Sequence, residues 1–149
     1  MSLSNTAEND LLLLLFNNTN WANVGDATGL RGSTTAGSFY ISLHTADPGE
    51  TGNQTTNETA YTNYARQAVA RSSGGWTVSG TAPTQAANAA AINFPQCGAS
   101  GATITHLIVG RDSSSTGESI YYGALTSSLA VSSGITPSFA IGALTCTMD

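Results

Sequence analysis

The sequence predicts a mainly β protein: an antiparallel, jelly-roll-like β-sandwich of about eight strands with one short N-terminal helix. Three observations lead to this prediction. From residue 33 onward the apolar residues show no helical period. Short runs rich in Val, Ile, Thr, Tyr and Phe then recur between clusters of Gly, Ser, Asn and Pro. The length of 149 residues suits one domain with a sizeable core.

The helix is expected over residues 5–17. Asn5 can cap its first turn, and Glu8 can reach back to the Asn5 amide. Asn17 and Asn18 suit its end because asparagine tolerates the left-handed conformation, and Trp21 is then expected to fold back as an anchor. A broad apolar face is supplied by Leu11, Leu12, Leu14, Leu15 and Phe16.

A helix with so many large apolar residues cannot remain solvated. The sequence leaves two arrangements open: the helix packs on the sheet of its own subunit, or it docks as an arm on a neighbour. We therefore divide the chain into an N-terminal helix or arm, residues 1–24, and a β-sandwich, residues 25–149, within one globular domain.

The expected strands are separated by turn residues throughout the rest of the chain. They span residues 38–44, 65–71, 75–79, 85–94, 103–111, 119–125, 129–132 and 138–147. Alternation in the last strand would place Phe139, Ile141 and Ala143 on one face. Strand order cannot be derived from these patterns.

The first strand leads into a polar segment. Alternation in that strand places Ile41 and Leu43 on the core face and Ser42 outside. Residues 49–62 are too polar for a core and too long for a tight turn, so we expect a projecting surface loop. The sequence D-P-G at 47–49 opens it, since proline presets the turn and glycine accepts a positive φ.

Charge and cysteine content restrict the partners. The net charge is −5 and the basic residues are four scattered arginines, so no basic footprint for nucleic acid exists. Charged residues make up 9% of the chain, which suits a subunit packed against copies of itself or a shell protein. The apolar run 11–16 fits neither a membrane span nor a signal peptide. Cys97 and Cys146 are expected to be buried thiols, with a disulfide left open.

One dense cluster of potential ligands comprises His44, Asp47, Glu50 and Glu58. Calcium would be the best candidate ion, yet the spacing matches no calcium-binding loop. We expect a solvated turn whose carboxylates accept hydrogen bonds from nearby amides. No nucleophile elbow or phosphate-binding loop is present. The sequence therefore predicts no catalytic residue, no metal and no cofactor.

Aromatic and basic side chains near this segment are candidate anchors. Trp76 follows two glycines and is expected to be buried at the start of a strand. Tyr61 and Tyr64 lie beside the polar loop and are expected to be half exposed. Arg66 and Arg71 are placed on opposite faces of one strand, and each is expected to pair with an acid.

Six motifs resemble a known family and together cover nearly the whole chain. They are S-N-x-A-E-N at 4–9, F-N-N-T-x-W-A-N at 16–23, L-H-T-A-D-P-G-E-x-G at 43–52, Y-x-x-Y-A-R at 61–66, G-G-W-T-V at 74–78 and S-G-I-T-P-x-F at 133–139. In these motifs the chain resembles small structural proteins of tailed bacteriophages, often labelled tail-fibre-like. The resemblance implies a non-enzymatic virion protein that is assembled in the cytoplasm of the bacterial host.

Within that family we favour a capsid cement or decoration protein, because the chain is short and has no fibre repeat or coiled-coil heptads. Such a protein would self-associate, as a homotrimer, and lock neighbouring subunits of the major capsid protein. The alternative is a tail, baseplate or fibre adaptor, or a receptor-touching tip. A secreted carbohydrate-binding domain would need a signal sequence or clustered exposed aromatics. Neither nucleic acid nor a membrane is an expected partner.

The partner contacts are expected mainly in the N-terminal segment, with two tyrosines beside the polar loop. The residues are Asn5, Leu11, Leu12, Leu15, Phe16, Trp21, Tyr61 and Tyr64.

Overall fold

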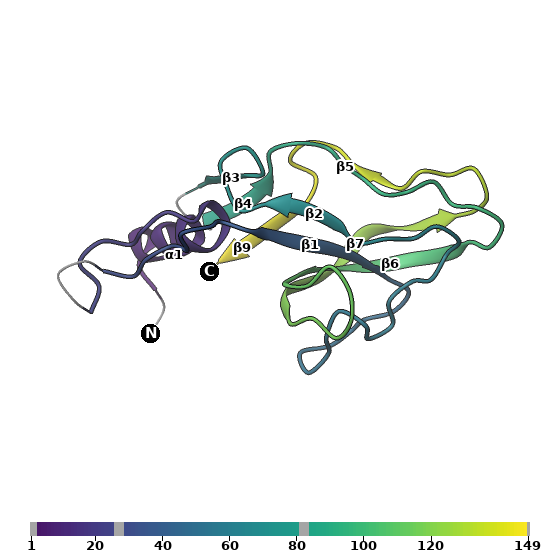
Figure 1. The fold of residues 1–149 in the computed structure, drawn as a ribbon, viewed down its shortest axis with the longest axis horizontal. Coiled ribbons are helices and arrows are strands. Elements are labelled where there is room, and N and C mark those ends of the chain that lie inside the picture. The colour runs from purple at the N-terminus through teal and green to yellow at the C-terminus, as the bar shows by residue number, and fades with distance from the viewer. Residues whose placement is uncertain (1–2, 26–28, 81–83, 149) are drawn as a thin grey trace. The chain divides into compact units, whose positions relative to one another are not determined.

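The computed structural model describes residues 3–25, 29–80 and 84–148 (Figure 1). The predicted mainly β, sandwich-like fold with a single N-terminal helix is confirmed, and these described residues contain nine strands in antiparallel sheets. In chain order the elements are α1 (Asn5–Asn17), β1 (Ser38–His44), β2 (Gln67–Ala70), β3 (Trp76–Ser79), β4 (Thr84–Asn88), β5 (Ile92–Asn93), β6 (Ala102–Gly110), β7 (Ser119–Val131), β8 (Ser138–Phe139) and β9 (Thr145–Met148).

The strands form three sheets, with the orders β2-β1-β6-β7, β3-β4-β9 and β5-β8. The chain divides into two compact units that each combine distant parts of the sequence. Unit 1 comprises Met1–Ser38, Val69–Ala91 and Phe139–Asp149, and unit 2 comprises Phe39–Ala68 and Ile92–Ser138. The expected division between residues 24 and 25, like the jelly-roll topology, stays a prediction.

Helix α1 has the predicted bounds, but its first turn is capped differently. Ser4 is the N-cap: its backbone is extended, and its side chain accepts a hydrogen bond from the Ala7 N–H at 3.3 Å. Glu8 is buried, and its Oε2 accepts a hydrogen bond from Thr84 Oγ1 at 3.4 Å. The predicted Asn5 cap is therefore wrong by one residue. Asn18 ends the helix with φ 56°, as predicted.

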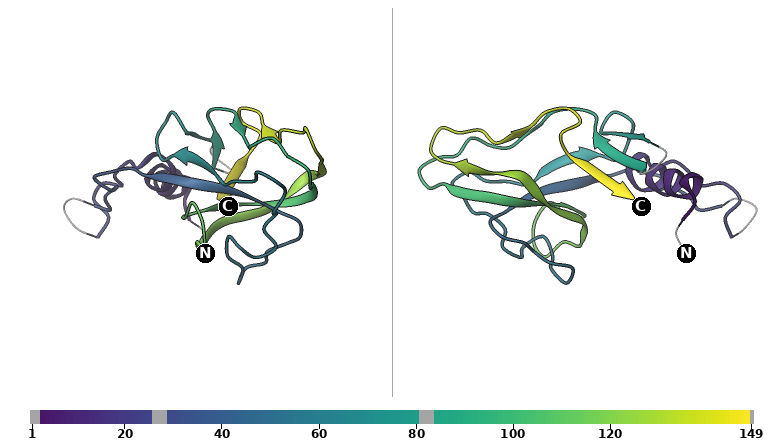
Figure 2. Two further views of the ribbon diagram at one scale, coloured as in Figure 1. Left: turned by 45° about the vertical axis from the view of Figure 1, so that its right-hand side comes forward. Right: turned by 180° about the vertical axis from the view of Figure 1, so that it is seen from behind.

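Unit 1 has an apolar core between α1 and the sheet that contains β3 and β4. Leu12, Phe16 and Trp76 are each 0% exposed. The Phe16 ring meets Trp76 edge-on, with ring centroids 4.7 Å apart. Figures 1 and 2 show α1 beside β3 and β4 in different views. Of the two predicted arrangements, the helix adopts the first and packs on the sheet of its own chain.

Unit 2 contains most of the four-stranded sheet. Strand β1 pairs with β6 in antiparallel register, with Tyr40 opposite Gly110 and His44 opposite His106. Ile41 and Leu43 are buried, as predicted. The prediction that Ser42 lies outside is wrong, because Ser42 is 0% exposed. As an inner strand of the sheet, β1 is buried along both faces from Ile41 to its end.

Two predicted strands are interrupted and two others are joined. Residues 85–94 divide into β4 and β5, residues 138–147 divide into β8 and β9, and the strands predicted at 119–125 and 129–132 form the single strand β7. The Ala143 N–H donates to Ala140 O at 3.1 Å, which makes a turn between β8 and β9.

That turn makes the predicted common face of the last strand wrong. Ile141 is 70% exposed and Ala143 is also exposed, because both lie in the turn and not in a strand. The side chains that enter the core there are instead Leu144 and Cys146.

Candidate interaction site

Two loops of unit 2, residues 45–62 and 111–118, are held together by hydrogen bonds. We call them the loop pair. The Gln54 backbone N–H donates to Gly117 O at 2.9 Å, and Gln54 Oε1 accepts from the Asp112 N–H at 2.9 Å. The Gln54 side chain also donates to Tyr40 O on β1 at 3.3 Å. Gln54 is 0% exposed, so it acts as a buried polar core for both loops.

Arg66 is the second link in the loop pair. Its Nε and Nη2 lie 2.7 and 2.8 Å from the two carboxylate oxygens of Glu58, a bidentate pair. The same guanidinium donates to the carbonyls of Gln54, Asp112 and Ser115 at 3.1, 2.9 and 2.8 Å. Its side chain is only 3% exposed. Arg66 therefore ties both loops, and the Glu58 carboxylate raises the pKa of Arg66.

Tyr64 connects this ion pair to the sheet. Its hydroxyl donates to Glu58 Oε1 at 3.0 Å and accepts from the Leu43 N–H at 3.0 Å. The Thr59 N–H donates to Leu43 O at 2.9 Å, so both backbone groups of Leu43 are paired with this segment. Burial raises the pKa of Tyr64, which keeps its hydroxyl protonated and able to donate.

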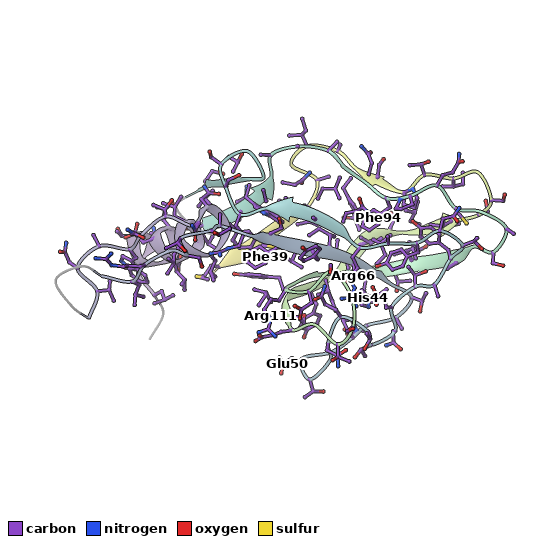
Figure 3. All side chains as sticks on the ribbon, in the orientation of Figure 1. Phe39, His44, Glu50, Arg66, Phe94 and Arg111 are labelled. Carbon is purple, nitrogen blue, oxygen red and sulfur yellow. The ribbon has the colours of Figure 1, made fainter. Side chains whose placement is uncertain are left out.

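His44 lies at the base of the loop pair (Figure 3). Its Nδ1 is 2.8 Å from Thr56 O, and its Nε2 is 2.9 Å from Ser42 Oγ. Burial lowers the pKa of His44, although Thr56 O and Glu58 act in the opposite direction. The neutral ring therefore donates from Nδ1 to the carbonyl and accepts from the Ser42 hydroxyl at Nε2.

The four residues considered as potential ligands, His44, Asp47, Glu50 and Glu58, are engaged separately. Glu58 binds Arg66, both nitrogens of His44 have partners, and Asp47 Oδ1 accepts from the Gly49 N–H at 2.9 Å. Glu50 is exposed and lies toward the far end of its loop in Figure 3. Within residues 3–25, 29–80 and 84–148, no group of three or more His, Cys, Asp or Glu could hold a metal ion. The predicted hydrogen bond from a turn amide to a carboxylate is confirmed at Asp47.

The loop of residues 49–62 is more firmly anchored than the sequence predicts. Gln54 and Thr59 are buried inside it, so the expectation that it holds no core residue is wrong. Two glycines make the packing possible: an added Cβ at Gly110 or Gly117 would lie 2.0 or 2.1 Å from Gln54 side-chain atoms. No sequence pattern indicates this contact, because glutamine is usually an exposed residue. Gly49, with φ 68°, fills the predicted turn position.

The outer surface of the loop pair is polar, and four of its exposed residues are charged: Asp47, Glu50, Arg111 and Glu118. Its exposed residues are Thr45, Ala46, Asp47, Glu50, Thr51, Thr55, Asn57, Ala60 and Thr62 from the first loop, and Arg111, Ser113, Ser114, Ser115, Thr116 and Glu118 from the second. Arg111 pairs with Glu118 at 3.2 Å and lies 3.6 Å from Asp112. Side-chain hydroxyl groups are therefore the most frequent polar groups on this surface.

The predicted partner-contact residues have different environments. In unit 1, Asn5 is exposed, Leu11 and Leu15 are partly buried, and Leu12 and Phe16 belong to the core. Their role in binding a partner stays a prediction.

Trp21 is partly buried and is not one of the buried core residues, and its role as an anchor stays a prediction. Its backbone forms an isolated bridge with Leu30 through hydrogen bonds of 2.8 and 2.9 Å.

Of the two tyrosines considered as partner contacts, Tyr61 is less accessible than predicted. Tyr61 is 2% exposed, and its hydroxyl donates to Pro95 O at 2.9 Å, so the expected half-exposure is wrong for this residue. Tyr64 is partly buried. Tyr61 and Tyr64 meet edge-on, with ring centroids 5.3 Å apart, and Tyr64 stacks on Phe94 at 6.2 Å. Core packing therefore accounts for much of these aromatic surfaces.

The two arginines are not on one strand, because β2 begins after Arg66 and ends before Arg71. Arg66 pairs with an acid, as predicted. Arg71 donates to the carbonyls of Leu14, Leu15 and Ala36. It thus places a positive charge at the C-terminal end of α1, where helix carbonyls lack partners within the helix.

The two cysteines are free and buried, as predicted for thiols. Burial raises the pKa of Cys146 to about 12, so this thiol is not reactive near neutral pH.

A family model described as podophage GP4 fiber I protein gp80 matches residues 2–147. The chain belongs to this family. It is therefore a phage virion structural protein, as the resemblance implied, and a structural fibre family of this kind is typically non-enzymatic. No curated protein matches the chain. Among the described residues, no helix is both long and apolar enough to span a membrane.

Proposed function

We propose that this protein is a fibre-associated subunit of the phage particle that acts by binding. The family match over residues 2–147 carries this proposal, since the family is described as a fibre protein. The helix has 13 residues and packs on its own sheet. The chain thus contributes a sheet-based module and no coiled-coil shaft in its described part. Of the two virion roles considered from sequence, the family match favours the fibre.

The loop pair is our proposed contact surface for a receptor or a neighbouring fibre protein. Arg66 and Gln54 fix its backbone, so binding would cost little loop ordering. Its exposed side chains are mostly Ser, Thr and Asn, which suit adaptable hydrogen bonding to a polar partner. Single contacts of this kind are weak, and several copies on one particle would strengthen attachment through multivalency.

Capsid cement is the second candidate, and the low charge content of 9% favours it. In this role a homotrimer would lock subunits of the major capsid protein by binding the assembled shell better than its parts. The contact would then use the N-terminal segment. Asn18 ties its side chain to both backbone groups of Ser33 at 2.7 Å, and the Trp21–Leu30 pair lies beyond this tie. Leu30 is 42% exposed.

Cryo-electron microscopy of the intact virion distinguishes the two locations. We expect density for this chain on the tail fibres. Density at capsid three-fold positions would establish the cement role and overturn the fibre proposal. Particles that lack the chain at both places would overturn both roles.

Binding of the purified full chain to host cells tests the loop pair. We expect Ser113→Asp combined with Ser114→Asp to weaken binding by about tenfold, because both exposed hydroxyls become charges. Thr77→Asp, at an exposed position on β3, is the matched control and should bind like the parent. Equal loss in both variants, or no loss in the loop variant, would overturn the assignment of this surface.

A further inference from the structure

Strand β7 forms one edge of the four-stranded sheet. It pairs with β6 on one side, and no other described strand pairs with it on the other. In an antiparallel strand, alternate residues direct their N–H and C=O groups toward each side. The outer side of β7 therefore carries backbone donors and acceptors that match another extended strand.

One part of β7 has the regularity that strand pairing needs. Residues Tyr121, Tyr122, Gly123 and Ala124 pair in unbroken register with β6. Register shifts lie on both sides of this stretch. We call these four residues, with their outward backbone groups, the β7 edge. Tyr122 is 40% exposed and Ala124 is also exposed, so the stretch is accessible in the described structure.

The β7 edge lacks two features that usually prevent strands from pairing between molecules. The whole strand, S-I-Y-Y-G-A-L-T-S-S-L-A-V, contains neither a charged residue nor a proline. The chain as a whole has a net charge of −5. Two copies approaching through an uncharged strand place no like charges opposite one another at the contact.

The shape of the β7 edge also fits a second copy of itself. An antiparallel pairing centred on Tyr122 places the two Tyr122 side chains opposite each other, where aromatic pairs stabilise a sheet. The same register places Gly123 of each copy opposite Tyr121 of the other. A Cβ added at Gly123 would meet no atom within 4 Å, so there is open space beside this residue. A large ring from the opposite copy can fill the space over a glycine.

We propose that two copies of this protein pair antiparallel through their β7 edges, which joins their four-stranded sheets into one continuous sheet. The interface is isologous, with a two-fold axis at Tyr122. It does not depend on the fibre assignment, and in the cement role it would replace the homotrimer by a dimer. It predicts a dimer, in contrast to the trimer expected from the sequence.

Sedimentation equilibrium of the full chain tests the pairing. We expect the unmodified protein to be a dimer, and Tyr122→Lys to weaken dimerisation by at least about tenfold, because two lysines would meet at the two-fold axis. Gly123→Leu should weaken it similarly by filling the space left for Tyr121. Thr77→Lys adds the same charge on β3 and should remain dimeric. Circular dichroism verifies that each variant is folded.

Cross-linking supplies a test that does not depend on weakening the interface. Residues facing each other across a two-fold axis in paired strands lie close enough for a disulfide. We expect oxidised Tyr122→Cys to give a covalent dimer and Thr77→Cys to give none. A monomeric parent protein, a trimer, or a dimer that both β7 variants leave unchanged would overturn the proposal, as would equal cross-linking at residues 77 and 122.

Discussion

The two arginines illustrate how differently the two units are built. In unit 1, Arg71 binds carbonyls at the end of a helix whose stability depends on the apolar contact between Phe16 and Trp76. In unit 2, Arg66 is itself part of the core and joins Glu58 to carbonyls of both loops. Removing Arg71 would weaken the contacts at one end of α1. Removing Arg66 would leave Glu58 and the carbonyls of both loops without their shared hydrogen-bond donor.

This difference has an energetic consequence. Apolar contacts are numerous and individually weak, so an apolar core loses stability in proportion to the atoms removed. A buried polar network depends on complete pairing, since one missing partner leaves a desolvated charge or dipole behind. The loop pair should therefore respond to conservative polar substitutions that would be harmless on an ordinary surface loop.

The largest effect is expected for Phe16→Ala. Phe16 is fully buried against Trp76, so truncation removes a large apolar side chain and leaves a cavity. We expect the free energy of unfolding to fall by about 4 kcal/mol in urea titration. Leu3→Ala, at a residue that is 48% exposed, is the control and should change it by less than about 0.5 kcal/mol. Similar losses in the two variants would contradict the assigned core.

Arg66→Met should lower the free energy of unfolding by about 3 kcal/mol, because Glu58 would keep its charge in a largely buried place without its cation. The control is Arg111→Met, which removes an exposed ion pair with Glu118 and should cost less than about 0.5 kcal/mol.

A second variant shows whether the loss at Arg66 comes from the stranded carboxylate. Arg66→Met combined with Glu58→Leu should recover part of the lost stability, since the buried charge is then absent. A double variant that is as unstable as the sum of its two single variants would indicate that Arg66 stabilises the loops without coupling to Glu58.

Arg71→Met is expected to lower the free energy of unfolding by about 2 kcal/mol. The substitution removes a charged donor from the C-terminal carbonyls of α1, but a partly buried helix end can regain some hydration. Helix signal in circular dichroism should decrease before the sheet signal on heating. An effect larger than that of Arg66→Met would invert the proposed contrast between the two units.

A smaller effect of the network should be visible as pH dependence. Burial lowers the pKa of His44 below its usual value near 6.5. Above about pH 6.5 the ring is neutral in both the folded and the unfolded state, so the full contribution of His44 to the free energy of unfolding is present. As the pH falls below that value, the unfolded chain binds the proton more readily, and folding stability decreases.

Urea titrations between pH 7.5 and 5 measure this dependence. The neighbouring charges Glu58, Arg66 and His106 also influence His44, so the comparison is made with His44→Asn. We expect the loss of stability on acidification to be smaller in that variant, even though it starts from a less stable state. Parallel curves for the two proteins would exclude His44 as the cause.

The sequence predicted the apolar part of the structure well and the polar part poorly. The helix bounds, the first strand, the burial of Trp76 and the break at Asn18 all follow from local periodicity or backbone preference. The burial of Gln54 depends on two glycines in the 110–117 region, more than 50 residues away in the chain. No local sequence pattern predicts the contact of Gln54 with these glycines, because the contact depends on the pairing of β1 with β6.

The Arg66–Glu58 pair was only half predictable for the same reason. An arginine in a chain with few charges is expected to find an acid, and Glu58 is near in sequence. Its almost complete burial was not predictable, since it requires carbonyls from the second loop as well. The turn between β8 and β9 is a further example of a structure that depends on a distant residue. In this turn the Gly142 N–H donates to Asn88 O at 2.9 Å, and the strand predicted from the sequence is interrupted there.

Ile141→Ser should change the free energy of unfolding least, and it tests most directly whether the turn interrupts the predicted strand. In a continuous strand, Ile141 would share the core face with Phe139, and replacement by serine would cost several kcal/mol. In the turn observed here, 70% of the residue is exposed, so we expect a change within about 0.5 kcal/mol. Cys146→Ser, at a buried position two strand residues from the end, supplies the contrast and should be clearly destabilising. A large loss of folding stability for Ile141→Ser in the monomeric protein would mean that this segment is a continuous strand and not a turn. A loss of stability found only in the assembled particle would instead identify Ile141 as a contact with another subunit.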